Sequence, residues 1–208
     1  MVKKYKTVAK YAEAEISIKK SRFIATVKPV KTQEEAEEFL DELRKKYWNA
    51  THNCYAYQIG KKNEIQRFSD DGEPQGTAGK PMLDVLKGEN LTDTIVVVTR
   101  YFGGTELGTG GLVRAYGRST KEGVLAAGII ECILVRRYIV TIPYTLVGKV
   151  QYLLAENGYI TEDEEYTEDV SLSVLVEEDN CEIFEDQIIQ ATSDEANIKK
   201  ENTLYIRR

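Results

Sequence analysis

The sequence is poor in the residue types that metal sites and disulfide frameworks need. Its 208 residues include one histidine, His52, and three cysteines, Cys54, Cys132 and Cys181. The cysteines are odd in number, far apart and outside any CxxC pair, so we expect neither disulfides nor a zinc site. No HExxH motif is present. We therefore expect no bound metal and no cofactor, and free thiols typical of a reducing compartment.

Long hydrophobic runs are also missing. No stretch approaches eighteen consecutive apolar residues, so no membrane span and no membrane partner are expected. The first residues, MVKKYKTVAKYAEAEI, contain lysines but neither an apolar run nor a small-residue cleavage site, and do not resemble a signal peptide. With 42% hydrophobic and 30% charged residues, the composition is that of a soluble globular protein. We expect a cytoplasmic location.

The net charge of −6 is unevenly distributed. From Arg136 to the end there are 7 Lys/Arg against 16 Asp/Glu, and the remainder has 21 against 18. An acidic rear half does not bind polyanions, whereas a mildly basic front half can. The acidic run TEDEEYTED (161–169) is either a solvated turn or a surface for a basic protein partner.

The front of the chain alternates strand and helix patterns. Alternating polarity over 13–30, with a turn near Lys20–Ser21, predicts a β-hairpin. Thr32, with Glu35 three residues on, forms a capping box for an amphipathic helix over 32–48. Further along we expect a strand over 53–60, a long loop over 61–81, a helix from Pro81 to Gly88, a strand over 93–102 that is buried on both faces, and a helix over 109–128.

The last seventy residues read as a separate unit. Their predicted order, βαββαβ, is that of a ferredoxin-like split βαβ fold. The boundary falls near residue 135, where the charge balance also changes. We therefore expect an α+β protein with two domains, 1–135 and 136–208.

Two glycine-rich loops each lead into a helix. Backbone N–H groups at a helix start favour an anion, and arginine side chains match phosphate oxygens. Glycines also serve tight turns and close packing, so a binding site and a structural role are both open. The spacing fits neither a Walker A loop nor a dinucleotide fingerprint. The second loop and its helix supply the candidate anion- or nucleic-acid-binding residues Arg100, Tyr101, Phe102, Gly103, Gly104, Gly108, Gly110, Gly111, Arg114 and Arg118.

The first loop and the strand before it supply a candidate pocket. Its residues are His52, Asn53, Asp70, Asp71, Gly72, Glu73, Pro74, Gly76, Thr77 and Gly79. His52 suits acid–base chemistry, metal binding or a structural hydrogen bond. The three acidic residues either hold Mg²⁺ beside a phosphate ligand or form a solvated turn. Cys54 lies on the strand face of His52, a geometry that rarely makes a nucleophilic pair.

Four motifs in order resemble one known family. They are SRF (21–23), HNCYAY (52–57), FSDDGEPQGTAGKPM (68–82) and VVVTRYFGGTELGTGGLVRAYG (96–117). Together they resemble the YigZ/IMPACT family, across essentially the whole chain. The resemblance implies a front domain like a small-subunit ribosomal protein domain and domain IV of elongation factor G, followed by a ferredoxin-like domain. It supplies no agreed catalytic residues.

For function, the resemblance and the basic front domain together imply a non-enzymatic regulator of translation that associates with RNA or the ribosome. In that interpretation Arg100, Arg114 and Arg118 contact phosphates, while Tyr101 and Phe102 stack on bases. Two alternatives are open. One is an enzyme or sensor for a small phosphorylated ligand held between the two loops, and the other is a protein-interaction module that uses the acidic rear domain.

Overall fold

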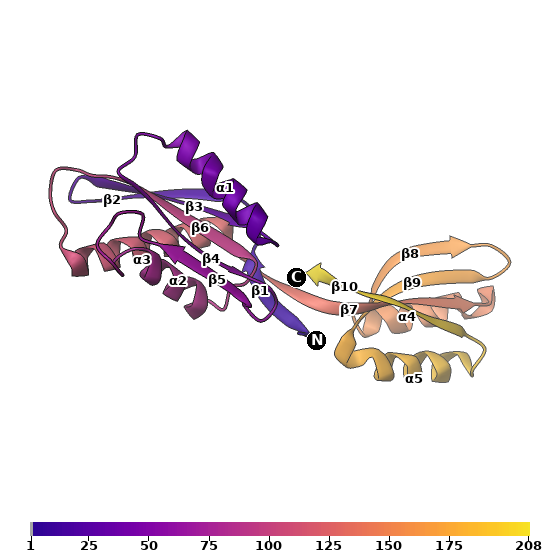
Figure 1. The fold of residues 1–208 in the computed structure, drawn as a ribbon. Helices are drawn as coiled ribbons and strands as arrows, with labels where there is room; N and C mark the ends of the chain where they lie inside the picture. The colour runs from indigo at the N-terminus through magenta and orange to yellow at the C-terminus, as the bar shows by residue number, and fades with distance from the viewer. Residues whose placement is uncertain (1) are drawn as a thin grey trace. The chain divides into compact units, whose positions relative to one another are not determined.

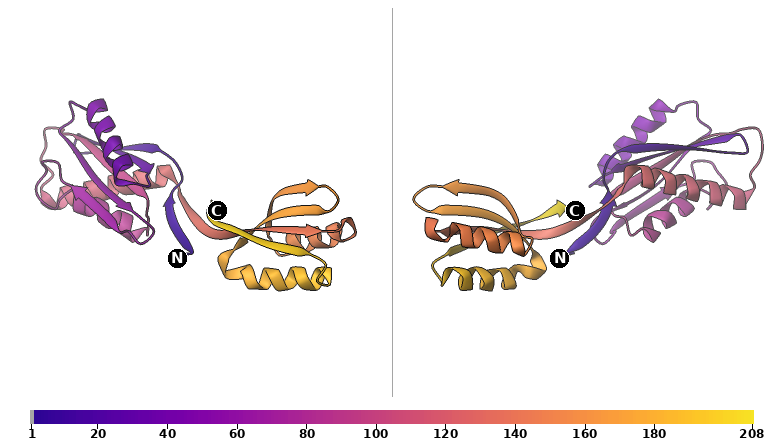
Figure 2. Two further views of the ribbon diagram at one scale, coloured as in Figure 1. Left: turned by 45° about the vertical axis from the view of Figure 1, so that its right-hand side comes forward. Right: turned by 180° about the vertical axis from the view of Figure 1, so that it is seen from behind.

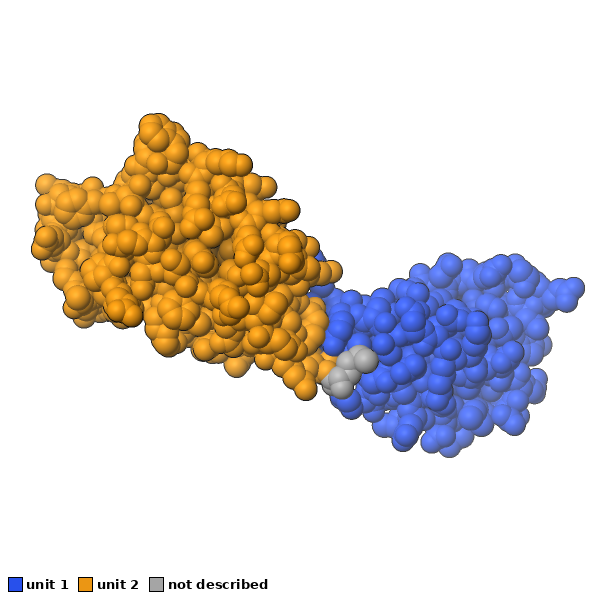
Figure 3. All heavy atoms as spheres, in the orientation of Figure 1, with its two compact units in different colours: residues 1, 3, 132–208 blue, residues 2, 4–131 orange. Residues whose placement is uncertain are grey.

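A computed structural model describes residues 2–208. These divide into two compact units, shown in different colours in Figure 3. Residues 4–131 make up most of one, here the front unit, and 132–208 most of the other, the rear unit. No helix within the described residues is long and apolar enough to cross a membrane.

The front unit is built on a five-stranded sheet in which every neighbouring pair is antiparallel. The order of its strands is β2-β3-β6-β4-β5. Strand β1 lies against Leu91 through Lys6. The strands of this unit are β1 (Lys4–Val8), β2 (Ala12–Ile18), β3 (Ser21–Pro29), β4 (His52–Ile59), β5 (Ile65–Ser69) and β6 (Thr94–Tyr101).

Strand β6 is central and buried on both faces, as the apolar run over 93–102 predicts. Successive side chains of a strand point to opposite faces. Val96 and Val98 therefore join the core on one face, and Ile95 and Val97 the core on the other. Because β6 presents apolar side chains on both faces, the sheet needs helices on both faces to bury them.

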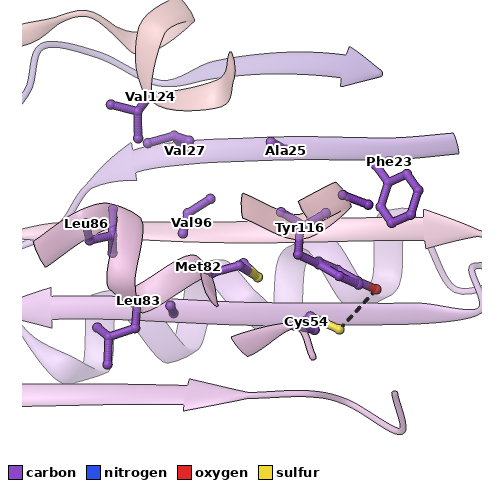
Figure 4. Close-up of a cluster of buried hydrophobic side chains, with 14 of the residues drawn as sticks. Phe23, Ala25, Val27, Cys54, Met82, Leu83, Leu86, Val96, Tyr116 and Val124 are labelled. Carbon is purple, nitrogen blue, oxygen red and sulfur yellow. Dashed lines mark hydrogen bonds between the residues drawn. The ribbon is translucent and has the colours of Figure 1, made fainter. Parts of the chain in front are cut away.

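Three helices supply that cover (Figures 1 and 2). Helix α1 (Gln33–Lys46) buries Phe39, Leu40 and Leu43 against one face. Helices α2 (Gly79–Gly88) and α3 (Thr109–Ala127) pack on the other. Figure 4 shows the core between the sheet and helices α2 and α3. There Tyr116 of α3 meets Phe23 of β3 edge-on, with ring centroids 5.3 Å apart.

The expected long loop over 61–81 is wrong in its first half. Residues Ile65–Ser69 form β5, which pairs with β4 from Ile59↔Ile65 to Tyr55↔Ser69. This strand lies at the edge of the sheet, and Arg67 and Phe68 are exposed. Because the strand is only five residues long and its apolar alternation is short, the sequence pattern is too weak to identify it. The loop proper runs over 70–78.

The rear unit has the predicted ferredoxin-like order. The four strands of this unit lie in the order β10-β7-β9-β8 with antiparallel neighbours, which is the order fourth, first, third, second. The elements are β7 (Ile129–Ile142), η1 (Tyr144–Leu146), α4 (Val147–Glu156), β8 (Ile160–Tyr166), β9 (Val170–Glu177), η2 (Glu178–Asn180), α5 (Cys181–Thr192) and β10 (Asn197–Arg207). The two-unit α+β fold class is confirmed.

One face of the rear sheet carries the core of this unit. Helices α4 and α5 lie side by side on it (Figure 2). Tyr138 of β7 packs on Phe184 of α5 with ring centroids 4.9 Å apart, and its hydroxyl donates to Glu185 at 2.6 Å. The acidic run 161–169 forms most of β8, at the edge of the sheet, and the turn after it.

Candidate functional site

The sheet of the front unit brings both predicted loops to one end. His52 opens β4 and Arg100 is near the end of β6, and the two are direct partners in the antiparallel pairing. The loop after β5 folds over the same end, because the His52 ring bonds to its Asp71 carbonyl at 2.7 Å. Residues that lie far apart in the chain therefore meet.

A buried ion pair lies at the centre of this site. The Arg100 Nη1 group donates to Glu73 Oε1 at 2.5 Å, and the two side chains are 6% and 3% exposed. The Tyr116 hydroxyl donates to the same oxygen at 2.8 Å, and Arg100 Nη2 also reaches Ser21 Oγ at 3.4 Å. Arg100 is thus a buried partner of Glu73, not the exposed phosphate ligand that the sequence indicated, and Glu73 is not part of a solvated turn.

His52 stands at the edge of this ion pair. Its Nδ1 faces the Asp71 carbonyl oxygen, which can only accept, so Nδ1 carries a proton. Its Nε2 lies 3.8 Å from Glu73 Oε1, and the side chain is 19% exposed. The ring is therefore fixed by the loop on one side, and its second nitrogen is directed toward the carboxylate.

Cys54 belongs to the buried side of the same cluster. Its Sγ lies 2.9 Å from the Asp70 carbonyl oxygen and 3.4 Å from the Tyr116 hydroxyl (Figure 4). Burial raises the pKa of the Cys54 thiol, and burial likewise raises the pKa of Tyr116. A protonated, enclosed thiol is a poor nucleophile, which argues against a Cys–His pair.

This environment predicts which thiols react. In the native full chain Cys54 and Cys132 are buried and Cys181 is half-buried. We expect Ellman's reagent to modify Cys181 alone in native protein, and all three cysteines in urea. The Cys181→Ser variant should then show no fast-reacting thiol. A fast thiol remaining in that variant would contradict the enclosure of Cys54.

The acidic residues of the first loop are engaged by backbone amides. Asp70 accepts from the N–H groups of Gly76, Ala78 and Gly79 at 2.8, 2.9 and 2.9 Å, so its carboxylate caps the start of α2. Asp71 accepts from the Asn53 N–H at 2.6 Å. No group of His, Cys, Asp and Glu in residues 2–208 has the arrangement of a metal site. These carboxylates order the loop.

The remaining residues of that loop support its shape. Gly72 and Gly76 adopt φ of +86° and +78°, where glycine is favoured. Thr77 bonds back to the Pro74 carbonyl at 2.6 Å. A Cβ on Gly79 would lie 2.8 Å from the backbone of Ser69, so this glycine allows close packing.

The glycines of the second loop divide into two kinds. A Cβ on Gly103 would overlap the Lys20 carbonyl group, and the Gly103 N–H donates to Ser21 Oγ at 3.1 Å. Gly104 and Gly108 have φ of +79° and +70° with open space beside them, and Gly110 and Gly111 lie in the first turn of α3. Close packing thus explains Gly103, and the others leave the start of α3 accessible.

The two aromatic residues at the end of β6 differ in how exposed their rings are. Phe102 is 49% exposed and lies beside Arg100, whose guanidinium carbon is 5.5 Å from the ring centroid. Tyr101 is partly buried, its hydroxyl donates to Asn49 at 3.0 Å, and Arg22 lies over its ring. Of the two, Phe102 presents the more open ring face.

Arg114 and Arg118 line a separate groove of about 350 Å³. Both are exposed and one helical turn apart on α3, and Lys19 of the β2–β3 turn lies opposite them. An Arg114 guanidinium nitrogen lies 3.8 Å from where a Gly110 Cβ would be, so Arg114 reaches back to the first turn of α3. The structure brings these arginines together, apart from Arg100.

A cavity of about 360 Å³ opens over the buried ion pair. Six predicted residues line it: His52, Glu73, Pro74, Arg100, Phe102 and Gly108. Sequence reasoning missed Ser21 and Tyr116, and also the cavity residues Thr51, Glu106, Leu107, Thr109 and Leu112. Tyr116 had one signal: it shares the apolar face of α3 with Leu112 and Ala115, where a buried hydroxyl needs a partner.

Comparisons with known proteins decide the family. Residues 19–124 match the model of the Impact N-terminal domain, and 140–195 match a domain of unknown function, DUF1949. The chain is 44% identical over 208 residues to "IMPACT family member YvyE" of Bacillus subtilis, covering all of this chain and 96% of that one. The chain belongs to the IMPACT family. The resemblance of its four motifs is thereby confirmed.

Other IMPACT relatives match the front unit. "IMPACT family member YigZ" of Escherichia coli is 47% identical over 107 residues, 50% of this chain and 52% of YigZ. "Protein IMPACT" of Xenopus laevis is 41% identical over 98 residues, 45% of this chain and 31% of that protein. A solved structure titled "Crystal structure of an hypothetical protein" is 30% identical with a TM-score of 0.62, covering 95% of this chain and 97% of that one. IMPACT membership supports a regulatory role in general terms.

Proposed function

We propose that this protein is a cytoplasmic, non-enzymatic regulator of translation that binds RNA or the ribosome through the groove beside α3. The observation that carries the proposal is a set of basic side chains without acidic partners. Among the described residues, no carboxylate lies within ion-pair distance of Lys19, Arg114 or Arg118. Exposed and uncompensated cations on one surface attract phosphates.

The arrangement of these cations supports the proposal. Arg114, Arg118 and Lys121 are exposed and follow one another at i, i+4 and i+7, along one face of α3. A row of this kind follows a phosphate backbone without reading bases, because its interactions are electrostatic.

The turn opposite the row also favours a binding role. Lys19 and Lys20 occupy its two central positions with φ of +45° and +68°. A two-residue hairpin of this type prefers Asn-Gly, and each side chain held there costs about 1 kcal/mol. The chain nevertheless has lysine at both positions, which places Lys19 at the groove.

The test is RNA binding measured against salt concentration. Arg114→Ala/Arg118→Ala in the full chain should weaken binding to a labelled single-stranded RNA at least about tenfold at low salt. The slope of log affinity against log salt should become shallower by about 0.7 for each phosphate that the variant no longer neutralises. Fluorescence anisotropy at several salt concentrations measures both quantities.

The matched control removes the same charge elsewhere. Lys62 and Arg67 are exposed on the β4–β5 hairpin, away from the groove. Lys62→Ala/Arg67→Ala should keep the wild-type affinity and slope. An equal loss in both double variants, or a wild-type affinity that does not change with salt, would show that the groove does not bind RNA.

A further inference from the structure

The cavity over the Arg100–Glu73 pair is distinct from the RNA groove. The two share only Leu107 among their lining residues. Its volume of about 360 Å³ is within the range of small-molecule sites, which combine apolar walls with a few placed polar groups.

One wall of the cavity is the start of α3, which has no side-chain cap. Gly108 is the N-cap of this 19-residue helix and makes no capping hydrogen bond. The other two long helices of the front unit are capped, α1 by Thr32 and α2 by the Asp70 carboxylate. The first N–H groups of α3 are therefore left for an external acceptor, and the helix dipole favours an anionic one.

The floor of the cavity carries a carboxylate oxygen that receives no hydrogen bond from the protein. Glu73 Oε1 accepts from Arg100 and Tyr116, but no hydrogen bond within residues 2–208 reaches its Oε2. The side chain as a whole is 3% exposed, and Oε2 is not one of the fully enclosed atoms, so it is open to the cavity that Glu73 lines. A carboxylate oxygen that lines a cavity and has no partner in the protein can accept a hydrogen bond from a ligand.

The charges around the cavity allow an anion at the helix end. Arg100 neutralises Glu73 at the floor, and the other carboxylate in the lining, that of Glu106, is exposed and therefore screened by solvent. Glu73 Oε2 requires a hydroxyl or amino donor. Phe102, half-exposed at the rim, offers a ring face to a planar group.

We propose that this cavity binds a small organic phosphate with hydroxyl donors and a planar ring, the chemistry of a nucleoside monophosphate. Its phosphate accepts from the N–H groups at the start of α3. A ribose hydroxyl donates to Glu73 Oε2, and the base lies against Phe102. This site stands independently of the RNA groove, since it uses neither Arg114 nor Arg118.

The test is calorimetric titration of the full chain with adenosine and uridine monophosphates, and with adenosine and inorganic phosphate separately. We expect saturable binding of a nucleoside monophosphate in the millimolar range or tighter, and at least about tenfold weaker binding of adenosine or phosphate alone. No saturable binding of either nucleotide would overturn the proposal, as would inorganic phosphate binding as tightly as the nucleotides.

A charge placed at the helix start separates binding from folding. Thr109→Asp should weaken nucleotide binding at least about tenfold by repulsion, while the same charge at a helix N-terminus favours the helix. The unfolding midpoint should therefore not fall. Gly117→Asp adds the same charge two turns further along α3, where a Cβ meets nothing within 4 Å, and should bind as the wild type does. Equal affinity of wild type and Thr109→Asp would overturn the site, and the RNA proposal would stand or fall separately on Arg114 and Arg118.

Discussion

Replacing Glu73 by alanine should lower the free energy of unfolding of the front unit by about 3–5 kcal/mol, because it leaves a buried arginine without its counter-ion. Arg100 is 6% exposed, and its other hydrogen bond goes to Ser21 Oγ at 3.4 Å. The Tyr116 hydroxyl loses its acceptor in the same step. Urea denaturation followed by circular dichroism measures the loss, and hydrogen exchange of the β6 amides assigns the transition to the front unit.

The control for Glu73 is an acidic residue in an exposed pair. Asp84 pairs with Lys80 at i,i+4 on α2, and both side chains are about half-exposed. Asp84→Ala should cost less than about 1 kcal/mol. Arg100→Met/Glu73→Gln removes both charges and should cost clearly less than the sum of its single variants. A loss for Glu73→Ala as small as that for Asp84→Ala would contradict a buried ion pair.

Gly103→Ala should be the second large destabilisation, by at least about 2 kcal/mol, because the added methyl group has no space. It would overlap the Lys20 carbonyl group at the β2–β3 turn. Relief requires moving backbone rather than a flexible side chain, and it breaks the bond from the Gly103 N–H to Ser21 Oγ. The same denaturation experiment measures this change.

Gly117→Ala is the matched control for Gly103→Ala, and its change in the free energy of unfolding should have the opposite sign. Gly117 lies inside α3, and a Cβ there meets nothing within 4 Å. Alanine should stabilise the protein by about 0.5–1 kcal/mol, since it raises helix propensity without a clash. If Gly103→Ala were as mild as Gly117→Ala, the close approach of Gly103 to the β2–β3 turn would be wrong.

The sequence predicts the elements whose signals are local. Thr32 Oγ1 accepts from the Glu35 N–H at 3.2 Å, as the capping box requires, and α1 begins there. The turn of the first hairpin lies at Lys19–Lys20, one residue before the predicted position. The βαββαβ order of the rear unit also follows from local periodicity. Each of these depends on residues within a few positions of one another.

The partners of the candidate site are not local, and sequence alone could not pair them. His52, Glu73, Arg100 and Phe102 were each identified as candidates, but the ion pair of Glu73 and Arg100 joins residues 27 positions apart. From the sequence alone, an arginine beside a glycine-rich loop, such as Arg100, is therefore interpreted as a phosphate ligand. Its burial depends on how β4, β6 and the 70–78 loop meet, which only the tertiary fold determines.

The structure assigns a packing role to some of the glycines and leaves others beside an accessible helix start. Gly103 and Gly79 lie where a Cβ would press on backbone, so their role is packing. Gly108 has open space beside it and leaves the start of α3 uncapped. The spacing of glycines in the sequence could not separate these two roles, because each depends on what lies across the loop.

Co-sedimentation with ribosomes from a cell lysate, at low and high salt, tests the proposed function most directly. Wild type, Arg114→Ala/Arg118→Ala and the control Lys62→Ala/Arg67→Ala are compared at equal concentration. We expect the wild type and the control to pellet at low salt and be released at high salt, while the groove variant stays in the supernatant. A groove variant that pellets like the wild type, or a wild type that never pellets, would contradict ribosome association through α3.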